Sequence, residues 1–132
     1  MNGRILKNIS NDYLVEANNQ IYNCKPRGIL RNQNEKPLVG DLVVIDPKKA
    51  VIDKIMPRKN FLVRPPVANV DYAVIVMSLV KPDFSANLLD KLILVCEYQG
   101  IKPIICFTKI DLNKKDFSDI FNYYQKIGYP IF

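Results

Sequence analysis

The residues whose types and spacing most clearly suggest chemistry are Thr108, Lys109, Ile110 and Asp111. They match a guanine-specificity box, in which Asn or Thr is followed by Lys, any residue and Asp. The Asp carboxylate of such a box accepts hydrogen bonds from N1–H and the exocyclic amine of guanine, a donor pair that adenine lacks. Each charge-assisted bond of this kind is worth about 1.5–3 kcal/mol. The Lys stem covers the base and the Thr anchors the loop, so the four residues predict a guanine-nucleotide site. The alternative is a polar turn in which Asp111 only caps the helix that follows.

The elements around the box predict that it lies at a ligand-binding edge. An apolar run over residues 103–107 ends at the box and predicts a buried strand. Residues 71–80 are rich in Val and Ile, which is typical of a strand covered on both faces. Between the two runs, Ser85 is the predicted N-cap and Gly100 the predicted stop of a well-buried helix. This βαβ order predicts a right-handed crossover, with the box at the carboxyl edge of a parallel sheet, where open α/β sheets bind ligands.

The phosphate end of a nucleotide site is missing from the sequence. None of the five glycines begins the pattern G-x-x-x-x-G-K-S/T, whose backbone amides cradle nucleotide phosphates. That loop usually precedes the guanine box, whereas here a basic, β-rich region precedes it. Either the chain is not a GTPase or the order of the fold is permuted. After the box, residues 117–127 predict one more helix, and residues 129–132 predict the start of a third strand.

No catalytic or metal site can be assembled from the sequence. The chain has three cysteines and no histidine, which excludes a Cys/His zinc site and a histidine-activated nucleophile within it. The cysteines are odd in number and widely spaced, which favours reduced thiols. We therefore expect no catalytic residue and no metal ligand, and no catalysis by this chain alone.

Five short β-rich runs, separated by turn residues, fill the first half of the chain. No helical period occurs among them, so they predict a small closed barrel. The polar stretch over residues 31–36 predicts an exposed loop. The five runs are residues 3–9, 13–17, 20–24, 42–45 and 50–55.

The net charge of +6 lies entirely in the first half. Residues 1–66 carry twelve basic and six acidic side chains, whereas residues 67–132 carry seven of each. This asymmetry predicts a basic module for RNA phosphates, joined to a neutral module with another task. Tyr22 or Phe61 could stack on a base. The alternative is an ordinary solvated basic surface. The candidate phosphate contacts are Lys25, Arg27, Arg31, Arg58, Lys59 and Arg64.

The sequence predicts neither a membrane span nor a secretory signal. A membrane-spanning helix needs about 20 consecutive, mostly apolar residues, and no such run occurs. The first residues include Arg4, Lys7 and Asp12 before any long apolar region. We therefore expect a cytoplasmic protein that does not bind membranes.

Six stretches, in order along nearly the whole chain, resemble the ribosome small-subunit-dependent GTPase A family of circularly permuted bacterial GTPases. Their shared order is more specific than the box alone. The stretches are RGILR at 27–31, LVGDLV at 38–43, RKNFLVRP at 58–65, ANVD at 68–71, KPDFS at 81–85 and CFTKIDL at 106–112.

The resemblance implies an OB-fold barrel in residues 1–62, which binds rRNA. In residues 63–132 it implies the first βαβ part of a circularly permuted P-loop GTPase domain. GTP would be the ligand of the box, and Thr108, where many GTPases carry Asn, predicts a weaker or different contact to the base. The P-loop and the ligands of Mg²⁺ and of a structural Zn²⁺ would lie outside this chain.

The implied partners are the 30S ribosomal subunit and its 16S rRNA, and the implied role is GTP hydrolysis in late maturation of that subunit. We expect a monomer. Two other classes stay open from the residues themselves. One is a non-enzymatic RNA-binding OB-fold protein whose second module only supports the barrel. The other is a short regulatory or interaction protein derived from a GTPase.

Overall fold

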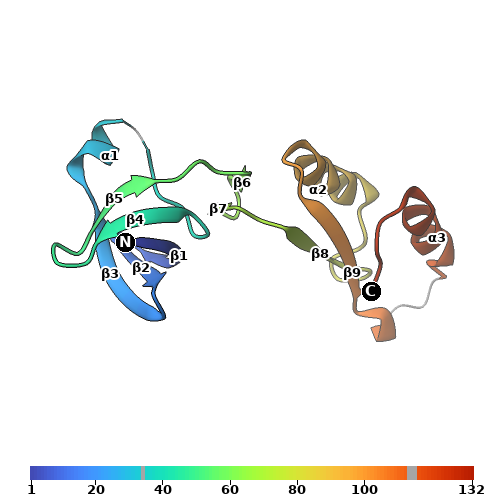
Figure 1. Cartoon of the computed structure of the whole chain (residues 1–132). Coiled ribbons are helices and arrows are strands. Elements are labelled where there is room, and N and C mark those ends of the chain that lie inside the picture. Colours follow the sequence, from blue (N-terminus) through green and yellow to red (C-terminus); the bar gives the residue numbers. More distant parts are fainter. Residues whose placement is uncertain (34, 113–115) are drawn as a thin grey trace. The chain divides into compact units, whose positions relative to one another are not determined.

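The chain forms two compact units, residues 1–70 and residues 71–132 (Figure 1). The computed structural model describes residues 1–33, 35–112 and 116–132, without the side chains of Arg31 and Leu112. The predicted domain boundary, after residue 62, precedes this division and stays a prediction. No helix among the described residues is long and apolar enough to cross a membrane.

The first unit is built on a closed barrel of five strands in the order β1-β2-β3-β5-β4. β3 and β5 run parallel, the other neighbours run antiparallel, and β1 closes the barrel on β4. This closure leaves no sheet edge to cover, and it confirms the predicted OB-like barrel. The strands are β1 (Asn2–Ile9), β2 (Asp12–Ala17), β3 (Gln20–Pro26), β4 (Leu42–Asp46) and β5 (Val51–Ile55).

The barrel core follows from the period-two pattern of its strands. Side chains alternate between the interior and the surface, so that Val15, Cys24 and Ile52 are fully buried. At Gly3, a Cβ would lie 2.6 Å from the Val15 Cγ1 and 2.8 Å from the Glu16 carbonyl oxygen, so β1 can approach β2 only with glycine there. A short helix, α1 (Gly28–Asn32), connects β3 to β4 and was not predicted.

A two-stranded hairpin follows the barrel, made of β6 (Phe61–Leu62) and β7 (Val67–Ala68). Backbone bonds fasten it to the turn before β4, because the Ala68 N–H donates to the Val39 carbonyl at 2.8 Å. A side-chain bond adds to this, since the Asn69 Nδ2 donates to the Gly40 carbonyl at 2.9 Å. Gly40 has a φ of +95°, and a Cβ there would lie 2.1 Å from the Ala68 carbonyl oxygen. Only glycine therefore fits between barrel and hairpin.

The second unit contains a parallel pair, β8 (Tyr72–Ser78) and β9 (Lys102–Thr108), connected by α2 (Ala86–Tyr98). The Ser85 Oγ accepts from the Leu88 N–H at 3.2 Å, which confirms the predicted N-cap. A 3-10 turn, η1 (Ile110–Leu112), and α3 (Ser118–Ile127) follow β9. Ile131 forms an isolated parallel bridge to Ile105, where the third strand was predicted to start.

The two helices of this unit cover one face of the sheet. Tyr124 of α3 donates to Asp90 of α2, and the ring centroids of Phe107 and Phe121 lie 4.8 Å apart. On β8, Ile75 is buried, whereas Val74 and Val76 on the other face are each 62% exposed. Coverage on both faces of β8 is therefore a wrong prediction for this chain, because α2 and α3 lie on the same side.

α2 is also less buried than predicted. Leu89, Ile93 and Cys96 are buried against the sheet. Further apolar side chains face away from it, with Leu94 69% and Tyr98 86% exposed. Apolar composition predicted the burial of this helix, but the described residues cover only one side of it.

Candidate guanine-binding site and basic surface

The four box residues lie where the parallel strands end. Thr108 is the last residue of β9 and pairs in register with Ser78, the last residue of β8. The segments that leave the two strands therefore emerge at the same edge of the sheet. Thr108 is half-buried, and Lys109, Ile110 and Asp111 are exposed. This placement puts the predicted guanine contacts on an accessible edge.

Lys109 and the segment after β8 are in direct contact. The Lys109 ammonium donates to the Lys81 carbonyl, and the Leu79 N–H donates to the Thr108 carbonyl at 3.2 Å. Lys109 adopts a φ of +59°, a left-handed conformation that few non-glycine residues take. The backbone thus turns sharply between the strand and η1.

Asp111 does not cap the α-helix that follows. It lies inside the 3-10 turn, whereas α3 begins at Ser118 with Phe117 as its N-cap. The Ser118 N–H donates instead to the Asp116 Oδ1 at 2.9 Å. The alternative in which the box carboxylate serves as the cap of α3 is therefore not supported, and its role as a guanine acceptor stays a prediction.

Two of the basic candidates belong to the β3 end of the barrel. Lys25 is exposed, and its Cα is paired with that of Val51 on β5. Arg27 follows β3, is 55% exposed in its side chain, and lies 3.1 Å from Asp53 in an Nη1–Oδ1 ion pair. An exposed pair of this kind contributes little to stability. Both cations thus remain accessible to an RNA phosphate.

Arg58 is held inside the first unit. Its Nε donates to the Asp41 Oδ1 at 2.8 Å and its Nη2 to the Asp41 Oδ2 at 2.7 Å, while Nη2 also donates to the Lys36 carbonyl. Asp41 is fully buried and accepts a further bond from the Leu38 N–H at 2.7 Å. The hydrogen bond to Asp41 raises the pKa of Arg58. The geometry is that of a structural pair, which sequence reasoning missed.

The remaining basic candidates lie on or near the hairpin. Lys59 is exposed, and its backbone N–H donates to the Asn69 side chain at 2.9 Å. Arg64 is exposed between β6 and β7. Phe61 is 42% exposed, with the Arg58 Cζ 5.8 Å from its ring centroid. The side chain of Arg31 lies outside the described residues.

Of the two aromatic residues that were predicted to stack on a base, Tyr22 is partly buried in the barrel. Tyr22 packs against the barrel core and donates its hydroxyl to the Gln20 Oε1 at 2.9 Å. The described basic candidates come from two stretches of the chain, the end of β3 and the segment after β5. The sequence alone could not show which of these basic side chains lie on the same surface.

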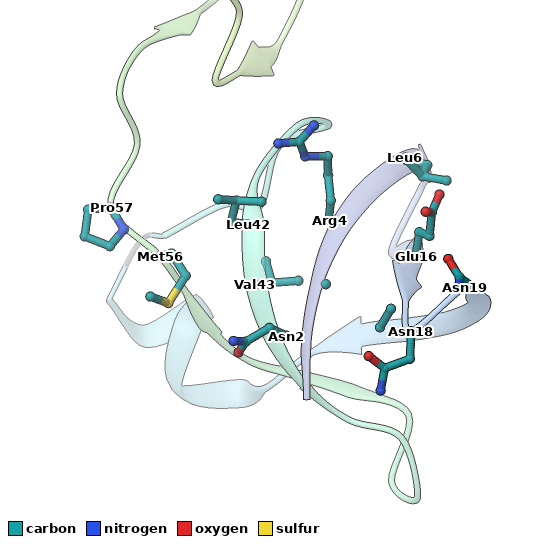
Figure 2. Close-up of a pocket in the computed structure, with 12 residues that line it drawn as sticks. Asn2, Arg4, Leu6, Glu16, Asn18, Asn19, Leu42, Val43, Met56 and Pro57 are labelled. Atoms are coloured by element: carbon teal, nitrogen blue, oxygen red, sulfur yellow. The ribbon is translucent and has the colours of Figure 1, made fainter.

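An open groove of about 950 Å³ lies on the outside of the barrel and was not predicted. Figure 2 shows Arg4 and Leu42 on neighbouring strands of its wall, with Met56 and Pro57 from the segment after β5. Asparagines at positions 2, 18 and 19 also line it. A single cation, Arg4, gives this groove little attraction for a phosphate backbone.

The described residues offer no metal centre. Among them, no group of three or more His, Cys, Asp or Glu side chains could hold an ion. All three cysteines are free thiols. Burial raises the pKa of the Cys24 and Cys96 thiols, which keeps them protonated.

Two family models together match almost the whole chain. The RsgA N-terminal domain matches residues 2–52 and the RsgA GTPase matches residues 55–132. Among relatives, the small ribosomal subunit biogenesis GTPase RsgA of Alkaliphilus metalliredigens is 44% identical over 135 residues, covering 98% of this chain and 46% of the relative. RsgA 2 of Oceanobacillus iheyensis is 46% identical over 136 residues, covering the same two shares.

Solved structures agree with the fold. YloQ, described as a circularly permuted GTPase, is 39% identical with a TM-score of 0.75. YjeQ from Thermotoga maritima is 31% identical, also with a TM-score of 0.75. Each comparison covers 98% of this chain and 50% of the solved chain. The chain thus spans about half the length of the relatives it matches.

Proposed function

Because this chain belongs to the RsgA family of circularly permuted GTPases, we propose that it supplies the RNA-binding barrel and the guanine-reading edge of a factor for small ribosomal subunit biogenesis. The observation that carries this proposal is the order of the two units. A closed barrel precedes a parallel pair whose carboxyl edge bears the guanine box. In that order, the box lies in the first part of the nucleotide-binding domain, before any phosphate loop.

At the box, the proposed contacts divide between three side chains. Asp111 accepts from N1–H and the amine of guanine, Lys109 lays its stem along the base, and Thr108 anchors the loop. Ile110 is the spacer between Lys109 and Asp111. Exposure of Lys109 and Asp111 at the sheet edge supports this assignment. GTP is the proposed ligand of the whole protein, and its hydrolysis the proposed activity.

Metal chemistry is not assigned to this chain. A GTPase family implies Mg²⁺, and the family resemblance implies a structural Zn²⁺. The described residues do not fit the zinc ion, since no group of three or more His, Cys, Asp or Glu side chains lies together among them. Mg²⁺ in a P-loop GTPase is bound by nucleotide phosphates and a phosphate-loop Ser or Thr, and this sequence contains no such loop. We therefore propose that both ions are held outside this chain, and we expect the chain alone to hydrolyse no GTP.

The barrel is the proposed contact for the 30S subunit and its 16S rRNA, in a cytoplasmic monomer acting late in subunit maturation. Lys25, Arg27, Lys59 and Arg64 are exposed and carry the proposed phosphate contacts, with Arg31 from the same basic half. Arg58 is the weakest member of the predicted set, because Asp41 and the Lys36 carbonyl already use its donors. We propose that it supports the surface from within.

The RNA proposal is tested by pelleting the chain with small ribosomal subunits across a salt series. One variant changes Lys25, Arg27, Lys59 and Arg64 to Ala, and a matched control changes Lys81, Lys91, Lys102 and Lys126 of the second unit. Each phosphate contact contributes about 0.7–0.9 to the slope of log affinity against log salt. We expect the first variant to bind more weakly with a flatter slope, and the control to bind as the wild type does. Equal losses of affinity in the two variants would show that the barrel is not the RNA-binding unit.

The guanine proposal is tested by NMR titration of the chain with guanosine and xanthosine monophosphates. Asp111→Asn turns one acceptor into a donor, which faces a guanine N–H but suits the xanthine carbonyl. The expected cost for guanosine is about 2–4 kcal/mol, from lost charge-assisted bonds and a mismatched donor. Wild-type affinity for guanosine should be weak, since the base contacts act without a phosphate loop. Unchanged guanosine preference in the variant would favour a non-enzymatic RNA-binding protein.

A further inference from the structure

The loop over residues 79–84, here called the β8–α2 loop, runs directly beside the guanine box. β8 and β9 end in register at Ser78 and Thr108, so the chain leaves both strands at one edge. The Leu79 N–H donates to the Thr108 carbonyl at 3.2 Å, and the Lys109 ammonium donates to the Lys81 carbonyl. The box lysine is therefore engaged by a backbone acceptor from a neighbouring loop.

Both residues of this contact have left-handed backbones. Lys81 has a φ of +47° and Lys109 a φ of +59°. A residue with a Cβ takes this conformation at a cost in free energy, and it persists where the surrounding structure fixes it. Two such residues, joined by one hydrogen bond at a ligand-binding edge, mark a local arrangement that other contacts must hold.

Three contacts hold the β8–α2 loop in place. The Ser78 Oγ donates to the Pro82 carbonyl at 2.9 Å, and the Phe84 N–H donates to the Leu79 carbonyl at 3.1 Å. The Phe84 ring packs at 5.7 Å between centroids on Phe107, the residue that precedes the box. The loop is thus closed on itself and attached to β9, which keeps the Lys81 carbonyl opposite Lys109.

We propose that the β8–α2 loop is the positioning element of the box lysine, with Ser78 as its positioning residue. The Lys81 carbonyl holds the Lys109 ammonium before any nucleotide arrives. The methylene stem is then already ordered where a purine base would lie against it, so binding does not have to immobilise a flexible side chain. This inference rests on the proposed guanine site and adds a second loop to it.

The first test measures how readily the lysine amines of the 132-residue chain react with an acylating reagent, by mass spectrometry. Lys109 should react more slowly than Lys91 in the wild type, because its ammonium is hydrogen-bonded. Ser78→Ala removes the donor that fixes the loop, and should raise the Lys109 rate by roughly two- to tenfold, the range that one ordinary hydrogen bond sets. Ser78→Thr keeps the hydroxyl and should restore the wild-type rate.

Ser85→Ala is the matched control, because among the described residues the Ser85 side chain bonds only the first turn of α2. This substitution leaves the loop contacts intact. It should leave the ratio of the Lys109 and Lys91 rates unchanged. An unchanged Lys109 rate in Ser78→Ala would overturn the proposal, since the loop would then not hold the lysine.

The second test repeats the guanosine monophosphate titration by NMR on the same variants. Ser78→Ala should weaken binding by a factor similar to its effect on labelling, whereas Ser78→Thr and Ser85→Ala should bind as the wild type does. If the wild type binds guanosine and Ser78→Ala binds it equally well, the loop has no positioning role and this inference fails alone. If the wild type shows no shifts at residues 108–111, the guanine site itself fails, and the inference with it.

Discussion

The two units of this chain differ in how completely they bury the apolar side chains of their sheets. The barrel curls one sheet onto itself, so its inward side chains, such as Val15 and Ile52, have no exposed surface. The second unit has a two-stranded parallel sheet with both helices on one side, and Val74 and Val76 on its other face are 62% exposed. A barrel needs no partner layer, whereas a parallel sheet needs one on each face. Apolar patterning alone therefore does not predict burial.

The largest expected effect comes from the buried ion pair of the barrel unit. Arg58→Ala leaves the Asp41 carboxylate buried without its bidentate partner, which should cost about 3–5 kcal/mol of unfolding free energy. Arg27→Ala removes an exposed pair with Asp53 and should cost at most about 1 kcal/mol. Urea unfolding followed by NMR signals of each unit measures both. Similar costs would mean that solvent reaches Asp41 in solution.

Two adjacent leucines on α2 test the second unit from within one helix. Leu89 is fully buried, and Leu89→Ala should cost about 2–5 kcal/mol through the cavity it leaves. Leu88 is 50% exposed, and Leu88→Ala should stay within about 0.5 kcal/mol. The difference should appear in signals from residues 71–132 and leave the barrel signals unchanged. A large cost at Leu88 would show that its face is covered in solution.

A titration at high pH should act on the second unit through Tyr124. Burial, and then the bond to Asp90, raise the pKa of Tyr124 well above its usual value. The folded chain thus holds this proton more tightly than the unfolded chain. Its contribution to stability is complete below about pH 10 and is lost as the pH rises from there towards the folded-state pKa.

Tyr124→Phe should remove this pH dependence and cost about 1 kcal/mol at neutral pH, by loss of the hydrogen bond. Tyr123→Phe is the control, because Tyr123 is adjacent and 59% exposed. The measurement is the unfolding midpoint of each variant between pH 8 and about pH 11. The midpoint should lose its dependence on Tyr124 ionisation in Tyr124→Phe and keep it in Tyr123→Phe. Equal pH profiles for the two variants would contradict the assignment to Tyr124.

The smallest expected effect is at the uncovered sheet face. Val76→Thr replaces an exposed methyl with a hydroxyl and should change stability by less than about 0.5 kcal/mol. Ile75→Thr, at the buried neighbouring position, should cost clearly more, because it both shortens the side chain and places a hydroxyl in the core. If Val76→Thr is as costly as Ile75→Thr, this face is covered in solution, and size-exclusion chromatography tests whether a second copy covers it.

Local signals in the sequence predicted most of the fold. The turn residues that separate the first three β-rich runs placed the first two hairpins, and Asn18 and Asn19 adopt the left-handed conformation that suits them to a tight turn. Ser85 placed the start of α2, because an N-cap depends only on residues that are close in the sequence. The short helix α1 was missed, since five residues are too few to show a period.

Contacts between distant residues could not be predicted. Arg58 and Asp41 are separated by 17 positions, and a basic residue in a basic stretch predicts an exposed charge rather than a buried pair. Lys109 and Lys81 are 28 positions apart. The box pattern therefore predicted a functional lysine but not the Lys81 carbonyl that accepts its hydrogen bond. The spacing of the box placed its residues on one loop, but only the register of β8 with β9 brings the second loop beside it.

The glycine at position 40 bears on how this protein can be divided for experiments. A barrel cut after β5, or after residue 62, would lose the Ala68 and Asn69 bonds that fasten the hairpin to Val39 and Gly40. The cut after residue 62 would also uncover the Asn60 side chain, which is 6% exposed, donates to the Val70 carbonyl and accepts from the Val70 N–H. An expression clone meant to yield the isolated barrel should therefore run through residue 70.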